Sequence, residues 1–431
     1  MRTRKPIKIY LPQKLLDGLQ DYLLNNPPNF SVKQEYFWVI INHLLKKQIQ
    51  FKNNEWNSIN LQTLQSMTVT NIGRYVSLLK NGEFLISNNN YLKGSHSQKY
   101  RLNEFYIDDI REYHLDPFSR AGEKYIKHSR KSKAHYNRLE PHLKIMQEHF
   151  NGFDFNYESA YAYTAQEKDL SKKLNYLTAI SSLKDKRSRY FKRNSTNLRL
   201  DTNFTNLKKE YRKFIIGDFI CIDLKNSQPF LLCLLIDKLL NPRDILCNHL
   251  IIENIEKTFG KRTISKILKI HQNNKEENLV NFTKFLDSVT NGTLYEDFVE
   301  MYDGDLDRND AKDIIFKIFF SKNFTWYNNK KFIPYREEKE VFASVYPFVA
   351  EIISELKERD NSLLPIFLQR LESNLFIDLI AKQLVENNIV PLTIHDSVIV
   401  DTKFLKETIE IMESVFNEQL GIVPKFDISC L

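Results

Sequence analysis

Two aspartates, each next to a short apolar run, are the residues of this sequence best suited to chemistry. Asp223 follows the apolar residues 219–222, and Asp396 stands in a His-Asp-Ser tripeptide between two apolar runs. Runs of this length are typical of buried strands. Because the tripeptide is the only polar interruption between its runs, we predict a tight hairpin with Asp396 at its tip. The simpler alternative is a turn in which the aspartate only caps its own backbone.

These aspartates are separated by 173 positions (396 minus 223). Neighbouring strands of one sheet would nevertheless bring both carboxylates to one place. Converging carboxylates without His or Cys ligands suit Mg²⁺, which prefers oxygen ligands. Two such ions about 3.5–4 Å apart activate a hydroxyl and stabilise the leaving oxygen of an in-line displacement. We therefore predict a site for two Mg²⁺ ions, with Mn²⁺ as the alternative ion.

A segment between the aspartates carries cations and aromatic rings at helical spacing. Its members recur every four residues and share one helix face: Arg308, Lys312, Phe316 and Phe320. Arg and Lys suit phosphate oxygens, and aromatic rings pack on a base or sugar, so this face suits a nucleoside triphosphate. The alternative is an ordinary amphipathic helix with its phenylalanines in the core and its cations at the rim. The spacing alone favours that alternative.

An α+β body is expected to position these segments, because helical runs alternate with a few short apolar strands from about residue 155 onward. An apolar helix is predicted directly after Asp223. Ser227 is expected to cap it, and Pro229 fits its first turn. The helix N-terminus beside Asp223 would favour anions.

Residues 58–103 form a separate small unit. Two short helices, the second over about 70–80, end at a stop signal at 81–82 and are followed by strands at 84–86 and 100–102. This order predicts a winged-helix-like unit. Such a unit either places its second helix in a DNA groove or docks on a protein, and we favour DNA contact.

Composition limits the class of protein. A chain of 431 residues is expected to form about two to four domains. Apolar residues make up 42% and charged residues 27%, a globular balance. The net charge of +8 suits a polyanionic partner, although solvated lysines explain it equally well.

Four cysteines without a CxxC pair argue against a disulfide framework or a zinc site. The N-terminus lacks an apolar signal core, and the longest apolar run, at 230–236, is too short to span a bilayer. We therefore expect a cytoplasmic protein with no membrane partner.

Taken together, the three segments resemble motifs A, B and C of family A DNA polymerases and the related phage-type single-subunit RNA polymerases. The shared order is an Asp after a strand at 223, R-x3-K-x3-F-x3-F from 308, and His-Asp-Ser at 395–397. A fourth segment, at 195–214, is similar to the family's stretch before motif A. The resemblance covers roughly residues 155–431. It implies a right-hand fold: a palm with a small antiparallel sheet, and helical fingers and thumb.

The resemblance implies a role for each matching residue. Asp223 and Asp396 would bind the two metal ions. Lys312 would meet the triphosphate and protonate the pyrophosphate, and Arg308 would grip the outer phosphates. Phe316 would pack on the incoming nucleotide. Nucleoside triphosphates and a primer–template are the implied partners.

Further matching residues would contact nucleic acid. Phe320 would hold the base of the templating pair, and His395 would lie near the primer terminus. Arg199 and Asn206 would contact the primer–template duplex, Arg199 in its minor groove. A basic run would belong to a thumb-like element that grips the nucleic-acid backbone: Lys184, Lys186, Arg187, Arg189, Lys192 and Arg193.

Three positions depart from the DNA polymerase pattern. Ser397 matches the RNA-polymerase form of motif C, and Ser321 stands where a glycine usually ends motif B. Gln228 replaces a glutamate that blocks the ribose 2′-hydroxyl. Its bulk favours deoxynucleotides, so we predict DNA synthesis over RNA synthesis.

The predicted division has six segments: 1–115, a winged-helix-like N-terminal domain; 116–154, a basic helical linker; 155–215, thumb-like helices and the start of the palm; 216–240, palm; 241–335, fingers; and 336–431, palm. No exonuclease pattern precedes the palm, so we predict synthesis without proofreading. Three alternatives stay open: a single-subunit DNA-directed RNA polymerase, a template-independent nucleotidyltransferase, and a non-catalytic, replication-initiator-like DNA-binding protein. The last would be expected to lack one of the two aspartates or the Arg/Lys pair.

Overall fold

The computed structural model describes residues 6–50, 57–58, 61–88, 99–107, 110–129, 138–184, 186, 189–241, 252–302, 304–327 and 330–431. The chain divides into two compact units that interleave in sequence. Unit 1 comprises Met1–Leu139, Phe153–Phe191 and Thr202–Ile216. Unit 2 comprises Glu140–Gly152, Lys192–Asp201 and Gly217–Leu431. The six contiguous segments predicted from sequence stay a prediction, because compactness does not identify polymerase subdomains.

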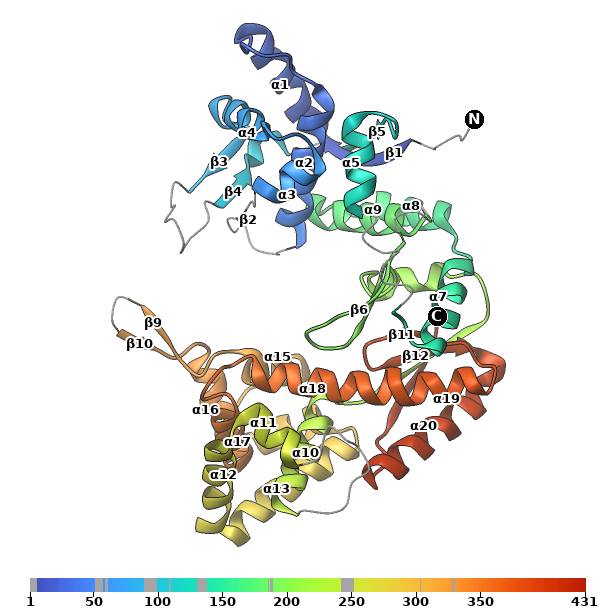
Figure 1. Ribbon diagram of the computed structural model, residues 1–431. Helices are drawn as coiled ribbons and strands as arrows, with labels where there is room; N and C mark the ends of the chain where they lie inside the picture. The colour runs from blue at the N-terminus through green and yellow to red at the C-terminus, as the bar shows by residue number, and fades with distance from the viewer. Residues whose placement is uncertain are drawn as a thin grey trace. The chain divides into compact units, whose positions relative to one another are not determined.

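Unit 1 is built on an antiparallel strand pair and long helices (Figure 1). Strand β1 (Ile7–Pro12) pairs with β5 (Ile110–Leu115). The helices are α1 (Gln13–Asn25), α2 (Gln34–Gln50), α5 (Arg120–Ser129), α8 (Tyr157–Ala165) and α9 (Leu170–Lys184).

Within unit 1, two short helices precede a small three-stranded sheet. Helix α3 (Leu61–Met67) is followed by α4 (Ile72–Asn81), and the sheet has the order β2-β4-β3. Its strands are β2 (Asn57–Ser58), β3 (Leu85–Ser87) and β4 (Lys99–Leu102). Helix α4 ends before Gly82, as predicted, and begins two residues later than predicted. This order is compatible with a winged helix, whose identification stays a prediction.

A four-stranded antiparallel sheet with the order β11-β12-β8-β13 organises unit 2. The strands are β8 (Phe219–Leu224), β11 (Leu392–Ile394), β12 (Ser397–Asp401) and β13 (Phe426–Cys430). Side chains alternate between the two faces of a strand. Ile222 and Val398, which are register partners, lie in the apolar core. Asp223 and Ser397 form the adjacent register pair, so their side chains share the opposite face of the sheet.

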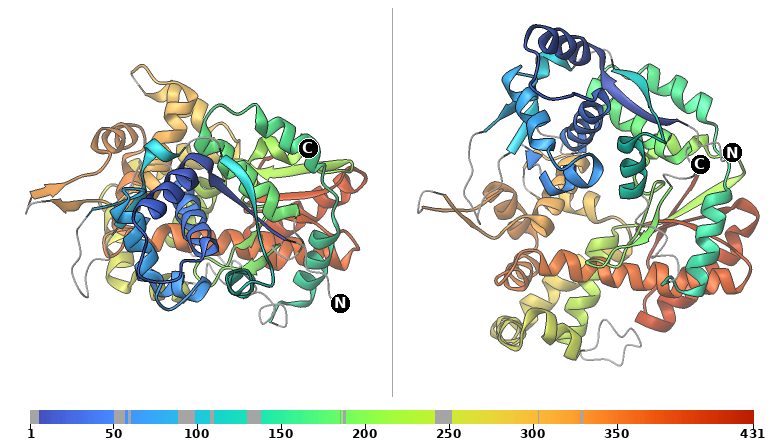
Figure 2. Two further views of the ribbon diagram at one scale, coloured as in Figure 1. Left: turned by 90° about the horizontal axis from the view of Figure 1, so that it is seen from above. Right: turned by 45° about the horizontal axis from the view of Figure 1, so that its top comes forward.

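A long helical segment crosses unit 2 (Figures 1 and 2). It runs through α18 (Leu363–Ser373), the π-helical η4 (Asn374–Ile380) and α19 (Ala381–Glu386). Helix α10 (Ser227–Leu240) packs against α18, and α7 (Pro141–Gly152) packs against α19.

The remaining elements of unit 2 are mainly helical. They are α11 (Ile252–Phe259), α12 (Lys261–Asn273), α13 (Lys275–Thr290), α14 (Leu294–Met301), α15 (Arg308–Phe320), α16 (Arg336–Val345), α17 (Pro347–Leu356) and α20 (Leu405–Leu420). A hairpin of β9 (Thr325–Tyr327) and β10 (Lys330–Phe332) follows α15. The α+β class is as predicted, since helices predominate over small antiparallel sheets. In the described part of the chain, no helix has the length and apolarity that crossing a membrane requires.

Candidate active site

The predicted hairpin tip is present in unit 2. Strands β11 and β12 pair with Ile394 opposite Ser397, which leaves His395 and Asp396 as a two-residue turn. His395 has a φ of 55°. The left-handed region at the first turn position is typical of two-residue hairpin turns, and His tolerates it better than a branched residue does.

This turn places Asp396 beside Asp223. In the sheet register Asp223 lies opposite Ser397, and the Ser397 hydroxyl donates a hydrogen bond of 2.6 Å to Asp223 Oδ1. The backbone N–H of Leu224 donates to the carbonyl oxygen of Asp396 at 3.2 Å. The structure thus brings together the two carboxylates that the sequence paired.

The pKa of Asp396 is raised from its ordinary value of 3.8 to about 7. Burial is the largest cause, and the negative charges of Glu372 and Asp223 act in the same direction. The neighbouring Ser227 hydroxyl has the opposite, smaller effect. A bound cation between Asp223 and Asp396 would relieve the repulsion between their carboxylates.

Glu372 is the site residue that sequence reasoning missed. It is 1% exposed and lies near the end of α18. Arg199 donates two hydrogen bonds to its carboxylate, from Nε to Oε1 at 2.8 Å and from a terminal nitrogen to Oε2 at 2.7 Å. Gln228 Nε2 donates to Oε2 at 2.6 Å. The sequence held one signal: Glu372 is the only acid between Asp360 and Asp378.

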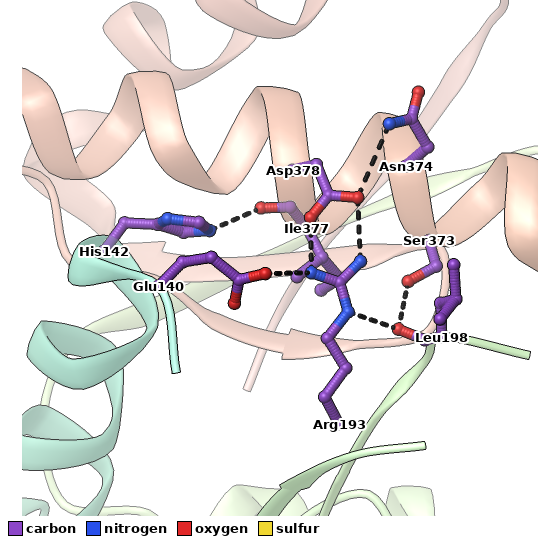
Figure 3. A network of polar contacts seen from close by, with 8 residues as sticks. All are labelled: Glu140, His142, Arg193, Leu198, Ser373, Asn374, Ile377 and Asp378. Atoms are coloured by element: carbon purple, nitrogen blue, oxygen red, sulfur yellow. Dashed lines mark hydrogen bonds and ion pairs between the residues drawn. The ribbon is translucent and has the colours of Figure 1, made fainter. Parts of the chain in front are cut away.

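Arg193, predicted to grip a nucleic-acid backbone, also has protein partners (Figure 3). Its guanidinium forks onto Asp378, with one of the two bonds 2.7 Å long, and its Nε donates to the Leu198 carbonyl at 3.0 Å. Glu140 lies 3.5 Å from the same guanidinium. Both Arg193 and Arg199 therefore contact carboxylates on the α18–η4 helix.

The other predicted nucleic-acid contacts are scattered. Arg189 lies in unit 1, where it donates to the Leu183 carbonyl at 2.7 Å and to the Tyr157 hydroxyl at 2.9 Å. Asn206 donates to the Tyr190 hydroxyl. Lys184, Lys186 and Lys192 are exposed, and Arg187 lies outside the described residues.

Helix α15 spans Arg308–Phe320, the range that the spacing predicts. The four predicted residues are all exposed, whereas the buried face consists of Ala311, Ile314, Ile315, Ile318 and Phe319. Phe316 and Phe320 stack with their ring centroids 5.3 Å apart. The alternative that placed these two phenylalanines in the core is therefore wrong.

Arg308, the first residue of α15, has protein partners. Arg308 Nε donates to Glu296 Oε1 at 2.6 Å, and its guanidinium lies 5.2 Å from the centre of the Tyr295 ring. Asp396 is close enough to Tyr295 to contribute to its raised pKa, whose main cause is burial. Tyr295 therefore connects the carboxylate pair with the start of α15.

The first turn of α10 differs from the prediction. Asn226, in the left-handed region with a φ of 53°, is the N-cap residue, and it makes no side-chain cap. The expectation that Ser227 caps the helix was therefore wrong, because the helix already begins at that residue. Pro229 occupies the first turn as predicted.

The residues present fit Mg²⁺. Among the described residues, no group of three or more His, Cys, Asp or Glu side chains is arranged to hold a metal ion. Asp223 and Asp396 nevertheless offer carboxylate oxygens, and Mg²⁺ commonly takes one or two carboxylates and completes its shell with water and phosphate. Asn226 Nδ2 and Gln228 Oε1 are buried without a hydrogen-bond partner in the described structure. Such atoms mark a place where water or a ligand completes the bonding.

Comparisons with known proteins do not assign the chain to a family. No protein-family model and no curated protein match the chain. Among solved structures, the chain is similar to the POL domain of Pol1 from M. smegmatis in complex with DNA primer-template and dNTP, with a TM-score of 0.34 and 10% identity. The match covers 64% of this chain and 55% of that chain. A TM-score this low does not establish a shared fold.

Proposed function

We propose that unit 2 is the catalytic body of a template-directed nucleotidyltransferase, a DNA polymerase of the family A type without proofreading. The observation that carries the proposal is the pairing of β12 with β8, which brings Asp396 beside Asp223. The four motif-like segments found in the sequence supply the reaction class. The α+β architecture is compatible with a palm, fingers and thumb.

The proposed reaction is an in-line displacement at the α-phosphorus of a nucleoside triphosphate. The 3′-hydroxyl of a primer gives up its proton to solvent water, and its oxygen forms the new bond to the α-phosphorus. The bond from that phosphorus to the α–β bridging oxygen breaks, and pyrophosphate leaves. When bound, two Mg²⁺ ions would lower the pKa of the attacking hydroxyl and neutralise the charge on the leaving oxygens. Asp223 and Asp396 would hold these ions, and Ser397 keeps Asp223 in its orientation.

Helix α15 would bind the triphosphate. Lys312 is exposed on the same face as Arg308, so both cations are accessible to phosphate oxygens. Lys312 would donate the proton that pyrophosphate needs on leaving, and Arg308 would exchange Glu296 for the outer phosphates. The stacked pair Phe316–Phe320 offers exposed rings for the nucleotide and its base pair.

The proposed partners are a primer–template and nucleoside triphosphates, with Mg²⁺ as cofactor. Arg199, Asn206 and His395 would contact the duplex. Because Arg199 is held by Glu372, its contact with nucleic acid would require this ion pair to open or to present the edge of the guanidinium. The α3–α4 part of unit 1 would contact DNA near the start site.

An extension assay tests the proposal. The purified chain, Mg²⁺ and all eight nucleoside triphosphates are supplied with a primed template, and a parallel reaction omits the template. We expect templated incorporation of deoxynucleotides, and loss of at least about a thousandfold in rate with Asp396→Asn. Asp401→Asn is the matched control, because it makes the same change at the far end of β12, the strand that follows Asp396.

The outcomes separate the alternatives. Preference for ribonucleotides identifies an RNA polymerase, and incorporation without template identifies a template-independent transferase. If Asp396→Asn incorporates as fast as wild type, the carboxylate pair has no catalytic role and the proposal fails. Tight DNA binding by a chain that incorporates no nucleotide under any condition would support the initiator-like alternative.

A further inference from the structure

The segment that runs from the second half of α15 into α16 has an unusual composition. Residues 314–336 contain eight aromatic residues and five Lys or Arg residues, and no acid. The hairpin β9–β10 lies in its middle and extends beyond the surrounding helices of unit 2 (Figures 1 and 2).

One face of this hairpin joins two aromatic rings with a lysine. Trp326 and Lys331 are register partners, so their side chains share a face. Phe324, two residues before Trp326, lies on that face as well, and the two rings meet edge-on with centroids 6.3 Å apart. The Lys331 ammonium lies 4.5 Å from the centre of the Phe324 ring. We call Phe324, Trp326 and Lys331 the hairpin face.

Both rings of the hairpin face are open to solvent. Trp326 is 64% exposed and Phe324 is 39% exposed. Nearby Phe332 and Tyr335 are 57% and 49% exposed. Large aromatic side chains gathered on an exposed surface mark a site of interaction, because their hydration is unfavourable.

We propose that the hairpin face binds unpaired nucleic acid, with Trp326 and Phe324 stacking on bases and Lys331 contacting phosphate. Aromatic rings interleaved with cations are the physical requirement for sequence-tolerant binding of single strands. The hairpin strands contain no acid. Three acids that flank residues 314–336 form ion pairs: Asp313 and Glu338 with Lys317, and Glu340 with Arg336. The charge available to phosphate is thus that of the hairpin lysines, Lys331 among them. Charge complementarity therefore favours a polyanionic strand over an acid-containing protein surface. The binding needs neither the carboxylate pair nor a metal ion, so it stands apart from the proposed function.

The test measures binding without catalysis. Full-length chain in EDTA is titrated into two labelled oligonucleotides of about 20 residues, a deoxythymidine homopolymer and an abasic strand of equal length. Wild type should prefer the homopolymer, because only that strand has bases to stack on. Trp326→Ala should weaken homopolymer binding at least about fivefold and leave abasic binding nearly unchanged, whereas Trp326→Phe should retain most of the affinity. Lys331→Gln should weaken the binding of the homopolymer and of the abasic strand by the same factor.

Phe105→Ala is the matched control, because Phe105 is also exposed and has a lysine, Lys14, 3.7 Å from its ring centre. Unchanged thermal melting of each variant shows that its fold is intact. If Trp326→Ala and the double variant Phe324→Ala/Trp326→Ala bind the homopolymer as wild type does, the proposal is overturned. It is overturned too if abasic binding falls in parallel, or if the only effect is weaker self-association in sedimentation velocity, which would assign the face to protein contact.

Discussion

Arg199 and Glu372 form a two-bond ion pair across 173 positions of the chain, with bonds of 2.8 and 2.7 Å. Glu372 is almost fully buried, and the Arg199 side chain is 17% exposed. The pair ties the segment before β8 to the helix that carries Glu372. It lies close to the two aspartates, because the charge of Asp223 contributes to the raised pKa of Glu372 and the charge of Glu372 contributes to the raised pKa of Asp396.

Arg199→Met should destabilise the chain strongly, because it leaves the buried Glu372 carboxylate without its cation. A loss of about 3–5 kcal/mol in the free energy of unfolding is typical of such a change. Urea denaturation measures it. The double variant Arg199→Met/Glu372→Leu should recover much of the loss, since the uncompensated charge is gone. A single variant as stable as wild type would contradict this account.

Gln228→Ala should relax the choice of sugar. Gln228, in the first turn of α10, is held by a 2.6 Å hydrogen bond to Glu372, whose carboxylate lies close enough to Asp223 to feel its charge. Removing it makes room for a ribose 2′-hydroxyl. Within the proposed function, the ratio of deoxynucleotide to ribonucleotide incorporation should fall by about tenfold or more. Incorporation ratios measured on one template check this, and an unchanged ratio would remove Gln228 from sugar selection.

Two neighbouring phenylalanines on α15 should respond differently to alanine. Phe319 is 2% exposed, so Phe319→Ala should cost about 3–5 kcal/mol of stability. Phe316 is 51% exposed, so Phe316→Ala should change stability by only about 0.5 kcal/mol. Phe316→Ala should instead raise the KM for nucleotide. Thermal melting and steady-state kinetics measure the two effects, and a large loss of stability with Phe316→Ala would argue against its exposure.

Asp396→Asn should stabilise the chain at pH 8 in the presence of a chelator. The folded-state pKa of Asp396, about 7, is above the ordinary value of 3.8. The folded form therefore binds the proton more tightly, and the stability contributed by this group is present below pH 4 and lost as the pH rises through about 7. Asparagine carries no charge, so the variant should gain up to about 4 kcal/mol at pH 8 and less at pH 5. Equal stability of wild type and variant at both pH values would contradict the raised pKa.

Lys357 should make the free energy of unfolding rise with pH in the alkaline range, whereas Asp396 makes it fall. Its ammonium is buried and donates to the carbonyls of Ile318 and Ser321 at the end of α15, the latter at 2.9 Å. Burial, with a smaller effect from Lys339, lowers its pKa to about 7 from 10.5. The unfolded chain then binds more protons between these values, so the free energy of unfolding should rise from pH 7 to pH 10. Lys357→Met should remove this rise, and an unchanged slope would show that Lys357 stays charged.

Local patterns in the sequence predicted the elements of the site well. The spacing of Arg308 and Phe320 predicted the bounds of α15, because both ends of the helix belong to one four-residue repeat. The polar tripeptide at 395–397 predicted the hairpin, because apolar strands on both sides left no other place for a turn.

What the sequence could not show depends on contacts between distant segments. Glu372 was visible as the only acid between Asp360 and Asp378, but nothing local pairs it with Arg199. Arg193 was expected to face phosphate, whereas Asp378, 185 positions away, meets its guanidinium. The packing of α7 on α19 places residues 140–152 in unit 2, although their neighbours in sequence belong to unit 1.

The π-helical turn at Asn374–Ile380 has a consequence for how these ion pairs coexist. A regular α-helix rotates by about 100° per residue, and a π turn accommodates one extra residue. The helix therefore has two rotational settings: before the turn it directs Glu372 to Arg199, and within it Asp378 meets Arg193. Deleting one residue from the π turn would rotate Asp378 relative to Glu372. The helix could then keep only one of its two ion pairs, either Arg199–Glu372 or Arg193–Asp378.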